Sequence, residues 1–235
     1  MFHPEGPTFL ELMRQALAST ERGYDMLAPK FDRTPFRTPD PVLEAMAKVI
    51  GEVDVALDVC CGTGAAMTHL RPLCRERVIG LDFSAGMLAE AARRVEAAPG
   101  SAKVELVRGD ALAMPFEGVA DVVTSVGAFG HIEPKDEDAF VAGIARALRR
   151  GGRFVFATGR MPPLSSPTWW ICRGFNAAMR VRNAVIDPPF VMYYLTFLWP
   201  DVERLLVRHG FRVEAREGLC PAPYERAIVV VATKM

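Results

Sequence analysis

The chain has 235 residues, of which 50% are hydrophobic and 24% charged, and its 28 basic residues balance its 28 acidic ones. This length suits one α/β domain with a modest insertion, and the apolar content predicts a sizeable core rather than disorder. Because the formal net charge is zero, nothing indicates a polyanionic partner, and we expect no nucleic-acid binding.

The cysteine count is odd and no pair has C-x-x-C spacing, which argues against a disulfide framework or a zinc site. A reducing, cytoplasmic setting is therefore expected. The N-terminus has no basic region followed by an apolar core, so we expect no secretion signal. The longest apolar stretch, 188–199, is too short to cross a bilayer as a helix, and we expect no membrane partner.

Residues 1–50 are predicted to form a helical cap before the sheet. Apolar side chains recur at helical spacing over 8–17. Pro41 is well placed to open another helix, which Gly51 would end. Between these helices lies the segment 24–32, which contains Tyr24 and Phe31.

The first strand of the sheet is predicted at 53–59, a short valine-rich run of the kind that is buried on both faces of a parallel sheet. It ends at Asp58, and a turn with Gly62 and Gly64 leads into a helix. Both glycines allow a sharp turn and let a ligand approach closely, and free N–H groups at the start of the helix face that ligand. We expect Gly64 to lie against the ligand with no room for a side chain.

Two further predicted strands also end in acids. The run 77–82 ends at Asp82, which follows the glycine turn by about the 20 residues at which a carboxylate can bind a ribose hydroxyl pair. Ser84 can cap the next helix, whose apolar stripe begins at Met87. The run 104–111 leads into Gly109 and Asp110, so three strands in succession end in an acid.

The rest of the sheet is predicted at 121–126, 153–158, 211–215 and 227–233, with helices at 135–150 and 200–209. No helix separates the last two strands, which indicates a terminal antiparallel pair. Residues 161–196 break the pattern with prolines and many aromatic side chains. We interpret them as a partly helical lid over the pocket; a dimerisation arm or ordinary packing on the sheet is the alternative.

Several of these stretches resemble class I S-adenosylmethionine-dependent methyltransferases of the ubiquinone/menaquinone-methyltransferase type. Residues 57–64 resemble the family's nucleotide-binding motif, with Cys60 where the family often has its first glycine. Residues 147–154 resemble its Leu-Arg-Pro-Gly-Gly turn, with Arg150 in place of proline. The resemblance covers 24–160 and 198–233. It implies one domain over 1–235, an α/β fold with a seven-stranded Rossmann-like doubly wound sheet, S-adenosylmethionine as cofactor, and methyl transfer to a small molecule. The aromatic content of residues 161–196 favours an apolar or aromatic acceptor.

The resemblance also implies the site. Asp82 would hold the ribose, Phe83 and Met87 would flank the adenine, and Asp110 with the Ala111 N–H would bind the adenine edge. An acid such as Asp58 suits an ammonium group rather than a pyrophosphate. The cofactor-binding residues implied in all are Tyr24, Phe31, Asp58, Cys60, Gly62, Gly64, Asp82, Phe83, Met87, Asp110, Ala111 and Ser125. No metal is implied.

His131 is the candidate catalytic base. It follows the fourth predicted strand, near where the family places the transferred methyl, and histidine is the side chain best suited to take a proton near neutral pH. The alternative is a loop histidine that hydrogen-bonds locally, since many methyltransferases use no base.

Two other functions remain open. An NAD(P)-dependent oxidoreductase would need G-x-G-x-x-G, but Met67 stands at the third glycine. A non-catalytic S-adenosylmethionine-binding module on the same fold is the other alternative, because fold alone does not establish chemistry. A monomer and a homodimer are both compatible with the sequence.

Overall fold

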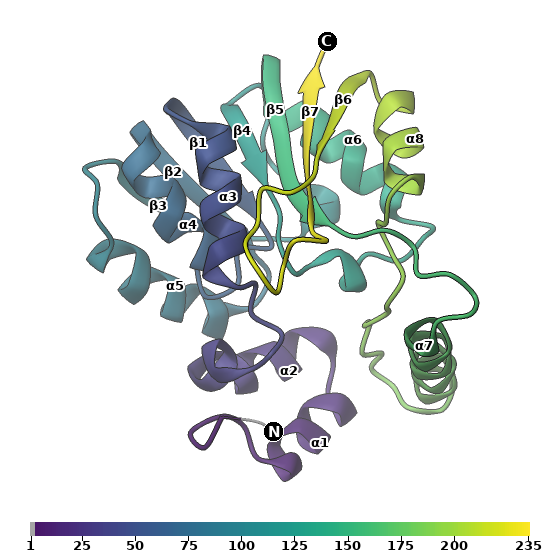
Figure 1. The fold of residues 1–235 in the computed structure, drawn as a ribbon. Helices are drawn as coiled ribbons and strands as arrows, with labels where there is room; N and C mark the ends of the chain where they lie inside the picture. Colours follow the sequence, from purple (N-terminus) through teal and green to yellow (C-terminus); the bar gives the residue numbers. More distant parts are fainter. Residues whose placement is uncertain (1–2) are drawn as a thin grey trace.

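A computed structural model describes residues 3–235 of the chain. Its centre is a seven-stranded sheet in the order β3-β2-β1-β4-β5-β7-β6 (Figure 1). All neighbours pair in parallel except those of β7, which is antiparallel to both β5 and β6. The predicted terminal antiparallel pair is therefore confirmed. The strands are β1 Val53–Val59, β2 Cys74–Asp82, β3 Lys103–Arg108, β4 Ala120–Thr124, β5 Leu148–Thr158, β6 Phe211–Arg216 and β7 Ile228–Lys234.

Helices cover both faces of the sheet (Figure 1). The α-helices are α1 Phe9–Leu17, α2 Thr20–Leu27, α3 Asp40–Ile50, α4 Ala65–Leu70, α5 Ala85–Ala97, α6 Glu137–Ala147, α7 Pro167–Val185 and α8 Asp201–Arg208. Short 3₁₀ turns are η1 Ala28–Arg33, η2 Arg71–Leu73, η3 Ala111–Ala113 and η4 Phe129–His131.

Two apolar clusters separate the layers. On one face, α3, α4 and α5 bury Met46, Met67 and Val95 against the sheet. On the other face, α6 and α8 bury Phe140 and Leu206. Because side chains alternate along a strand, both faces of each central strand are apolar, which explains the valine-rich runs.

Several predicted boundaries shift by a few residues, and the largest shift is at the start of β5. The helix expected over 135–150 ends at Ala147, and Leu148 already pairs with Ala120 of β4. Gly151 and Gly152 therefore lie within β5 rather than ending the helix. Gly151 has a φ of +76°, and the register between β4 and β5 shifts beside it. The glycines therefore allow the backbone of β5 to form an irregularity of the β-bulge type.

Of the cap expected over 1–50, α1, α2 and η1 precede the sheet as expected, whereas α3 packs on one face of the sheet. Thr8 caps α1 with a capping box to Glu11. Asp25 of α2 accepts hydrogen bonds from the Ser84 hydroxyl (2.6 Å) and the Gly86 N–H (2.8 Å) at the start of α5. These contacts hold the cap on the carboxyl ends of the strands.

Candidate functional site

The glycine turn after β1 and the acid after β2 form one hydrogen-bonded unit. One oxygen of Asp82 accepts from the Gly62 N–H at 2.8 Å, and the other accepts from the Ser84 N–H at 2.9 Å. Burial raises the pKa of Asp82, while these backbone hydrogen bonds oppose the rise. The carboxylate is 5% exposed and borders a cavity, so its remaining lone pairs could accept from a diol.

That cavity is open to solvent and lies at the carboxyl ends of the strands. Eight of the predicted site residues line it together: Tyr24, Phe31, Cys60, Gly62, Asp82, Phe83, Met87 and His131. Gly62 has a φ of +53°, and a Cβ added there would meet no heavy atom within 4 Å. Open space at this position is what close approach of a ligand requires.

The other predicted site residues do not line this cavity. Asp58 is fully buried, where its Oδ1 accepts from the Thr124 hydroxyl and its Oδ2 has no partner within the protein. Ser125 is also buried, and its hydroxyl has no protein partner. Asp110 accepts from the Leu112 N–H and caps the short η3 turn that begins at Ala111.

Gly64 has a different neighbour from the one that the sequence predicted. A Cβ added there would lie 2.6 Å from Cγ2 of Val95 and 3.2 Å from Cβ of Ala91, both in α5. Its φ is +78°. The glycine is therefore needed for the left-handed turn and for close packing of α4 on α5, rather than for contact with the cavity.

A second and more open cavity adjoins the first. Both cavities are bordered by Tyr24, Phe31, Phe36, Gly127 and His131, which form a shared wall. The far side of the second cavity comes from the segment after α7, and it includes Tyr193, Tyr194 and Leu195. Its lining is mainly aromatic and aliphatic.

Tyr24 and His131 are joined across the shared wall. The Tyr24 hydroxyl lies 2.7 Å from His131 Nε2, and His131 Nδ1 lies 2.5 Å from the Val191 carbonyl oxygen. A carbonyl can only accept, so Nδ1 carries the proton, and Nε2 accepts from the tyrosine. Burial lowers the pKa of His131 and raises that of Tyr24, which keeps both groups neutral near pH 7.

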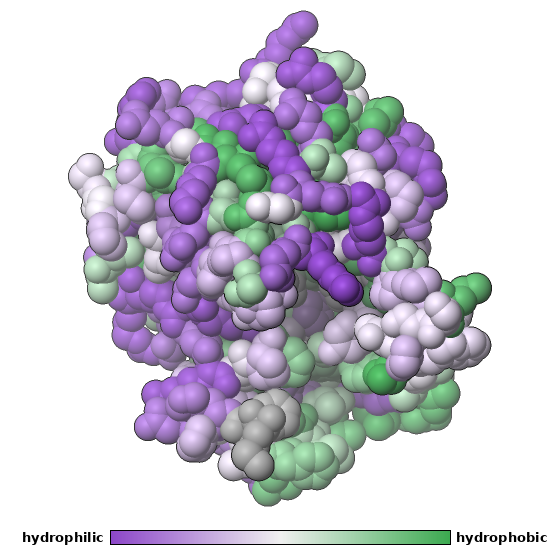
Figure 2. All heavy atoms as spheres, in the orientation of Figure 1, coloured by the Kyte–Doolittle hydropathy of each residue, from purple (hydrophilic) through white to green (hydrophobic). Residues whose placement is uncertain are grey.

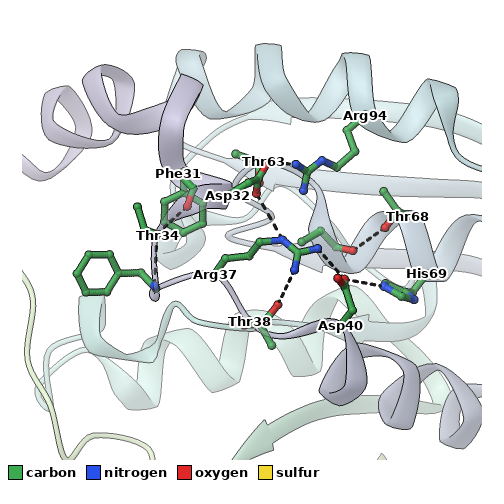
Figure 3. Close-up of polar contacts among 12 residues, drawn as sticks. Phe31, Asp32, Thr34, Arg37, Thr38, Asp40, Thr63, Thr68, His69 and Arg94 are labelled. Carbon is green, nitrogen blue, oxygen red and sulfur yellow. Dashed lines mark hydrogen bonds and ion pairs between the residues drawn. The ribbon is translucent and has the colours of Figure 1, made fainter. Parts of the chain in front are cut away.

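A polar network ties the N-terminal segment to the glycine turn (Figure 3). Asp32 accepts from the Thr63 hydroxyl at 2.8 Å and forms an ion pair with Arg94 of α5. Arg37 binds Asp40 at 2.6 Å and the Thr38 carbonyl at 3.3 Å, and its Nε lies 3.6 Å from Asp32. The network holds the Arg37 side chain at the edge of the first cavity.

Sequence reasoning missed several residues of this cavity, among them Phe36, Arg37, Thr38, Val126 and Ala128. The first three stand in a proline-interrupted linker that has no periodic pattern. Arg37 is the one guanidinium among the lining residues, and no spacing in the sequence singles it out. In residues 3–235, no group of three or more histidine, cysteine or acidic side chains could hold a metal ion.

The sequence relationships agree with this geometry. A family model described as a methyltransferase domain matches residues 56–152. The chain is 36% identical over 117 residues to a demethylmenaquinone methyltransferase of Lactiplantibacillus plantarum, a match that covers 48% of this chain and 49% of the relative. The match to a methyltransferase domain therefore covers the segment from β1 to the start of β5. The chain spans about half the length of the relatives that it matches.

Solved structures extend the similarity of fold beyond the segment that the family model matches. The DhpI complex with SAH has a TM-score of 0.65 at 19% identity and covers 96% of this chain and 98% of its own. A putative O-methyltransferase from Nostoc punctiforme has a TM-score of 0.68 at 16% identity, covering 96% of this chain and 67% of that one. At these identities the likeness concerns the fold alone, and it includes the N-terminal cap and the segment with α7.

Proposed function

We propose that this protein transfers a methyl group from S-adenosylmethionine to a small-molecule acceptor. The observation that carries the proposal is the pair of adjoining cavities that share the wall of Tyr24 and His131. One cavity has the polar groups that a nucleoside needs, and the other is largely apolar. A donor and an acceptor bound side by side would meet at this wall, which supports transfer by proximity and orientation.

The first cavity fits the cofactor in three ways. Asp82 has lone pairs for the ribose hydroxyls, and Gly62 leaves open space beside it. Arg37 offers N–H donors for the carboxylate of the amino-acid part, since Asp40 and Thr38 occupy only part of its five-donor fork. The proposed contacts of Asp58, Asp110, Ala111 and Ser125 with the cofactor rest on the family resemblance alone.

S-adenosylmethionine supplies the transferable methyl on a sulfonium, and the protein's residues supply alignment and proton transfer. We assign the proton to the Tyr24–His131 pair. When an acceptor hydroxyl or amine loses its proton to the Tyr24 oxygen, the tyrosine passes its own proton to His131 Nε2. The Val191 carbonyl holds the histidine in the tautomer that can accept. The aromatic wall also excludes water from the reacting atoms.

An apolar or aromatic acceptor is favoured by the lining of the second cavity, which includes Phe129, Tyr193, Tyr194 and Leu198. The similarity to the demethylmenaquinone methyltransferase of Lactiplantibacillus plantarum suggests a first candidate acceptor, demethylmenaquinone. We also propose that residues 161–196 close over this cavity as a lid, since the loop after α7 forms its far side.

The test has two stages. Calorimetry compares S-adenosylmethionine, S-adenosylhomocysteine and NADH, and we expect only the first two to bind. Multiple-turnover assays with a reduced, short-chain quinone and then with pooled metabolites follow the methylated product by mass spectrometry. Binding of NADH alone would favour an oxidoreductase. Cofactor binding without turnover across the pool would favour a non-catalytic module.

A further inference from the structure

The helix α7 turns an apolar face to solvent. Its residues Trp170, Gly174, Ala178, Val181 and Val185 recur at intervals of three or four, so they form one stripe along the helix. All five are exposed, with 64% exposure for Trp170, 65% for Val181 and 75% for Val185. A surface helix of a soluble protein normally turns such a stripe inward.

The opposite face of α7 makes the contacts with the rest of the protein, and many of them are polar. Asn176 is the one buried residue of α7, and its side-chain amide exchanges two hydrogen bonds of 2.8 Å with the backbone of Tyr194. Asn183 does the same with the backbone of Phe190 at 3.1 and 3.0 Å. The face of α7 with Asn176 and Asn183, on which Phe175 also packs against Tyr194, is thus fixed inward. The exposed apolar stripe on the other side is left without a partner in residues 3–235.

The helix α1 has the same inverted arrangement beside α7. Phe9, Leu10, Met13 and Leu17 are exposed on one side, while Gln15 is its buried residue. Arg182 of α7 donates to the Ala16 and Ala18 carbonyls at the end of α1, both at 3.0 Å, so the two helices are joined. Figure 2 shows hydrophobic residues along the lower part of the molecule, where α1 and α7 lie in Figure 1.

Positive charge borders this surface. α7 contains three arginines and no acidic residue. Arg173 and Arg180 are exposed beside the apolar stripe, and Arg14 is exposed on α1. The one acid of α1, Glu11, is paired with Lys30 at 2.7 Å. An exposed apolar face with tryptophan and a cationic border has the chemistry of a helix that lies in the surface of an anionic bilayer.

We propose that the outer faces of α1 and α7 form a docking surface for a membrane that contains anionic lipids. A symmetric contact between two copies of α7 would bring the arginines of both copies together with no acid on that helix to offset them. Anionic headgroups supply that charge. Docking requires no spanning segment, and no helix of residues 3–235 has the length and hydrophobicity to span a bilayer. The expectation of no membrane partner rested on the absence of a spanning apolar stretch in the sequence, and a helix that lies on the membrane surface needs no such stretch.

Docking would also place the second cavity near the lipid. The segment that follows α7 lines this cavity with Met192 through Thr196. An apolar compound dissolved in the bilayer would then reach the cavity beside α7. The docking surface itself does not depend on the proposed methyl transfer, because vesicle binding is measured without cofactor or acceptor.

The experiment is co-sedimentation of the full chain with phosphatidylcholine vesicles that contain or lack phosphatidylglycerol. We expect binding to the anionic vesicles that weakens as salt is added. Ile171, beside Trp170 on α7, is also 71% exposed, and the double variant Trp170→Ser with Ile171→Ser should lower the partition coefficient by about tenfold or more. Arg173→Gln with Arg180→Gln should lower binding to anionic vesicles by about tenfold and leave binding to neutral ones unchanged. The control Val207→Ser removes an apolar side chain that is 56% exposed on α8, and it should change nothing.

A second measurement uses the unmodified protein, so it does not depend on how the variants fold. Lipids brominated in the upper acyl chain should quench tryptophan fluorescence, because Trp170 would enter the interface. The proposal is overturned if the anionic vesicles bind no protein, if they cause no quenching, or if Val207→Ser is as harmful as the α7 variants. It is equally overturned if the α7 variants abolish a concentration-dependent dimer in sedimentation velocity and leave vesicle binding intact.

Discussion

The phenolic oxygen of Tyr24 lies 2.7 Å from Nε2 of His131, in the wall that separates the two cavities. Tyr24→Phe keeps the ring contacts of Tyr24 with Phe31 and Phe83 and removes only the proton relay. We expect kcat to fall by about 10²–10⁴-fold while cofactor affinity stays within about twofold. Tyr194→Phe removes a hydroxyl from the second cavity alone and serves as the control. Wild-type kcat in Tyr24→Phe would exclude the relay.

The same pair predicts a pH profile. Burial lowers the pKa of His131 below its ordinary range, and only the neutral imidazole can accept the proton. The rate should therefore be at its plateau near neutral pH and fall as the pH drops through that lowered pKa. Tyr24→Phe should lose this dependence, because its residual rate no longer uses the relay. Stopped assays over a series of buffers measure both curves, and identical profiles would contradict the assignment.

The two glycines of the turn should respond differently to alanine. Gly62→Ala meets no neighbour and costs only about 1 kcal/mol for its left-handed backbone, but its methyl group enters the cavity. We expect a stable protein whose cofactor affinity is at least about tenfold weaker. Gly64→Ala meets Val95 at 2.6 Å, so overpacking of about 1–3 kcal/mol should appear in urea unfolding. Equal losses of stability in the two variants would refute this division of roles.

Asp82→Asn tests the proposed ribose contact with little change in volume. In the wild type, one Asp82 oxygen accepts from the Gly62 N–H and the other from the Ser84 N–H. The asparagine amide has a single acceptor oxygen, so it can accept from only one of these two donors. We expect S-adenosylmethionine affinity to fall by about ten- to a hundredfold in calorimetry. Asp54→Asn is the control, since Asp54 is a partly exposed acid of β1 that does not line the cavity. Unchanged affinity in a folded Asp82→Asn protein would remove Asp82 from the site.

The proposed contact of Arg37 with the cofactor carboxylate can be tested by comparing two ligands, one with and one without that carboxylate. Arg37→Gln should weaken S-adenosylmethionine by about tenfold or more, because a charge-assisted contact with the carboxylate is lost. Methylthioadenosine lacks that carboxylate, and its affinity should not change. Arg94→Gln is the control, since Arg94 also pairs with Asp32 but does not line the cavity. A parallel loss for both ligands in Arg37→Gln would mean that Arg37 only supports the fold.

The sequence predicts those features of the fold and the site that are determined by residues close together in the chain. The strands and the turn were predictable because valine-rich runs, strand-end acids and left-handed glycines are local signals. The role of Gly64 was not, since its neighbour Val95 comes from another helix. Arg37 reaches the cavity only through the fold of a linker without a pattern. For α1 and α7, helical spacing identifies the apolar stripe but does not say which side faces the core.

Asp58 predicts a dependence of stability on pH. Burial raises its pKa to about 7 despite the hydrogen bond from Thr124. A carboxyl with a raised folded-state pKa binds its proton more tightly when folded. Its contribution to the free energy of unfolding is therefore complete near pH 4 and is lost as the pH rises through about 7.

The variant Asp58→Asn cannot ionise, so its stability should decline less than that of the wild type between about pH 5.5 and pH 8.5. Urea unfolding at both pH values measures this, with Asp54→Asn as an exposed control on the same strand. Parallel changes in the wild type and Asp58→Asn would show that Asp58 is ionised in the folded protein throughout this range.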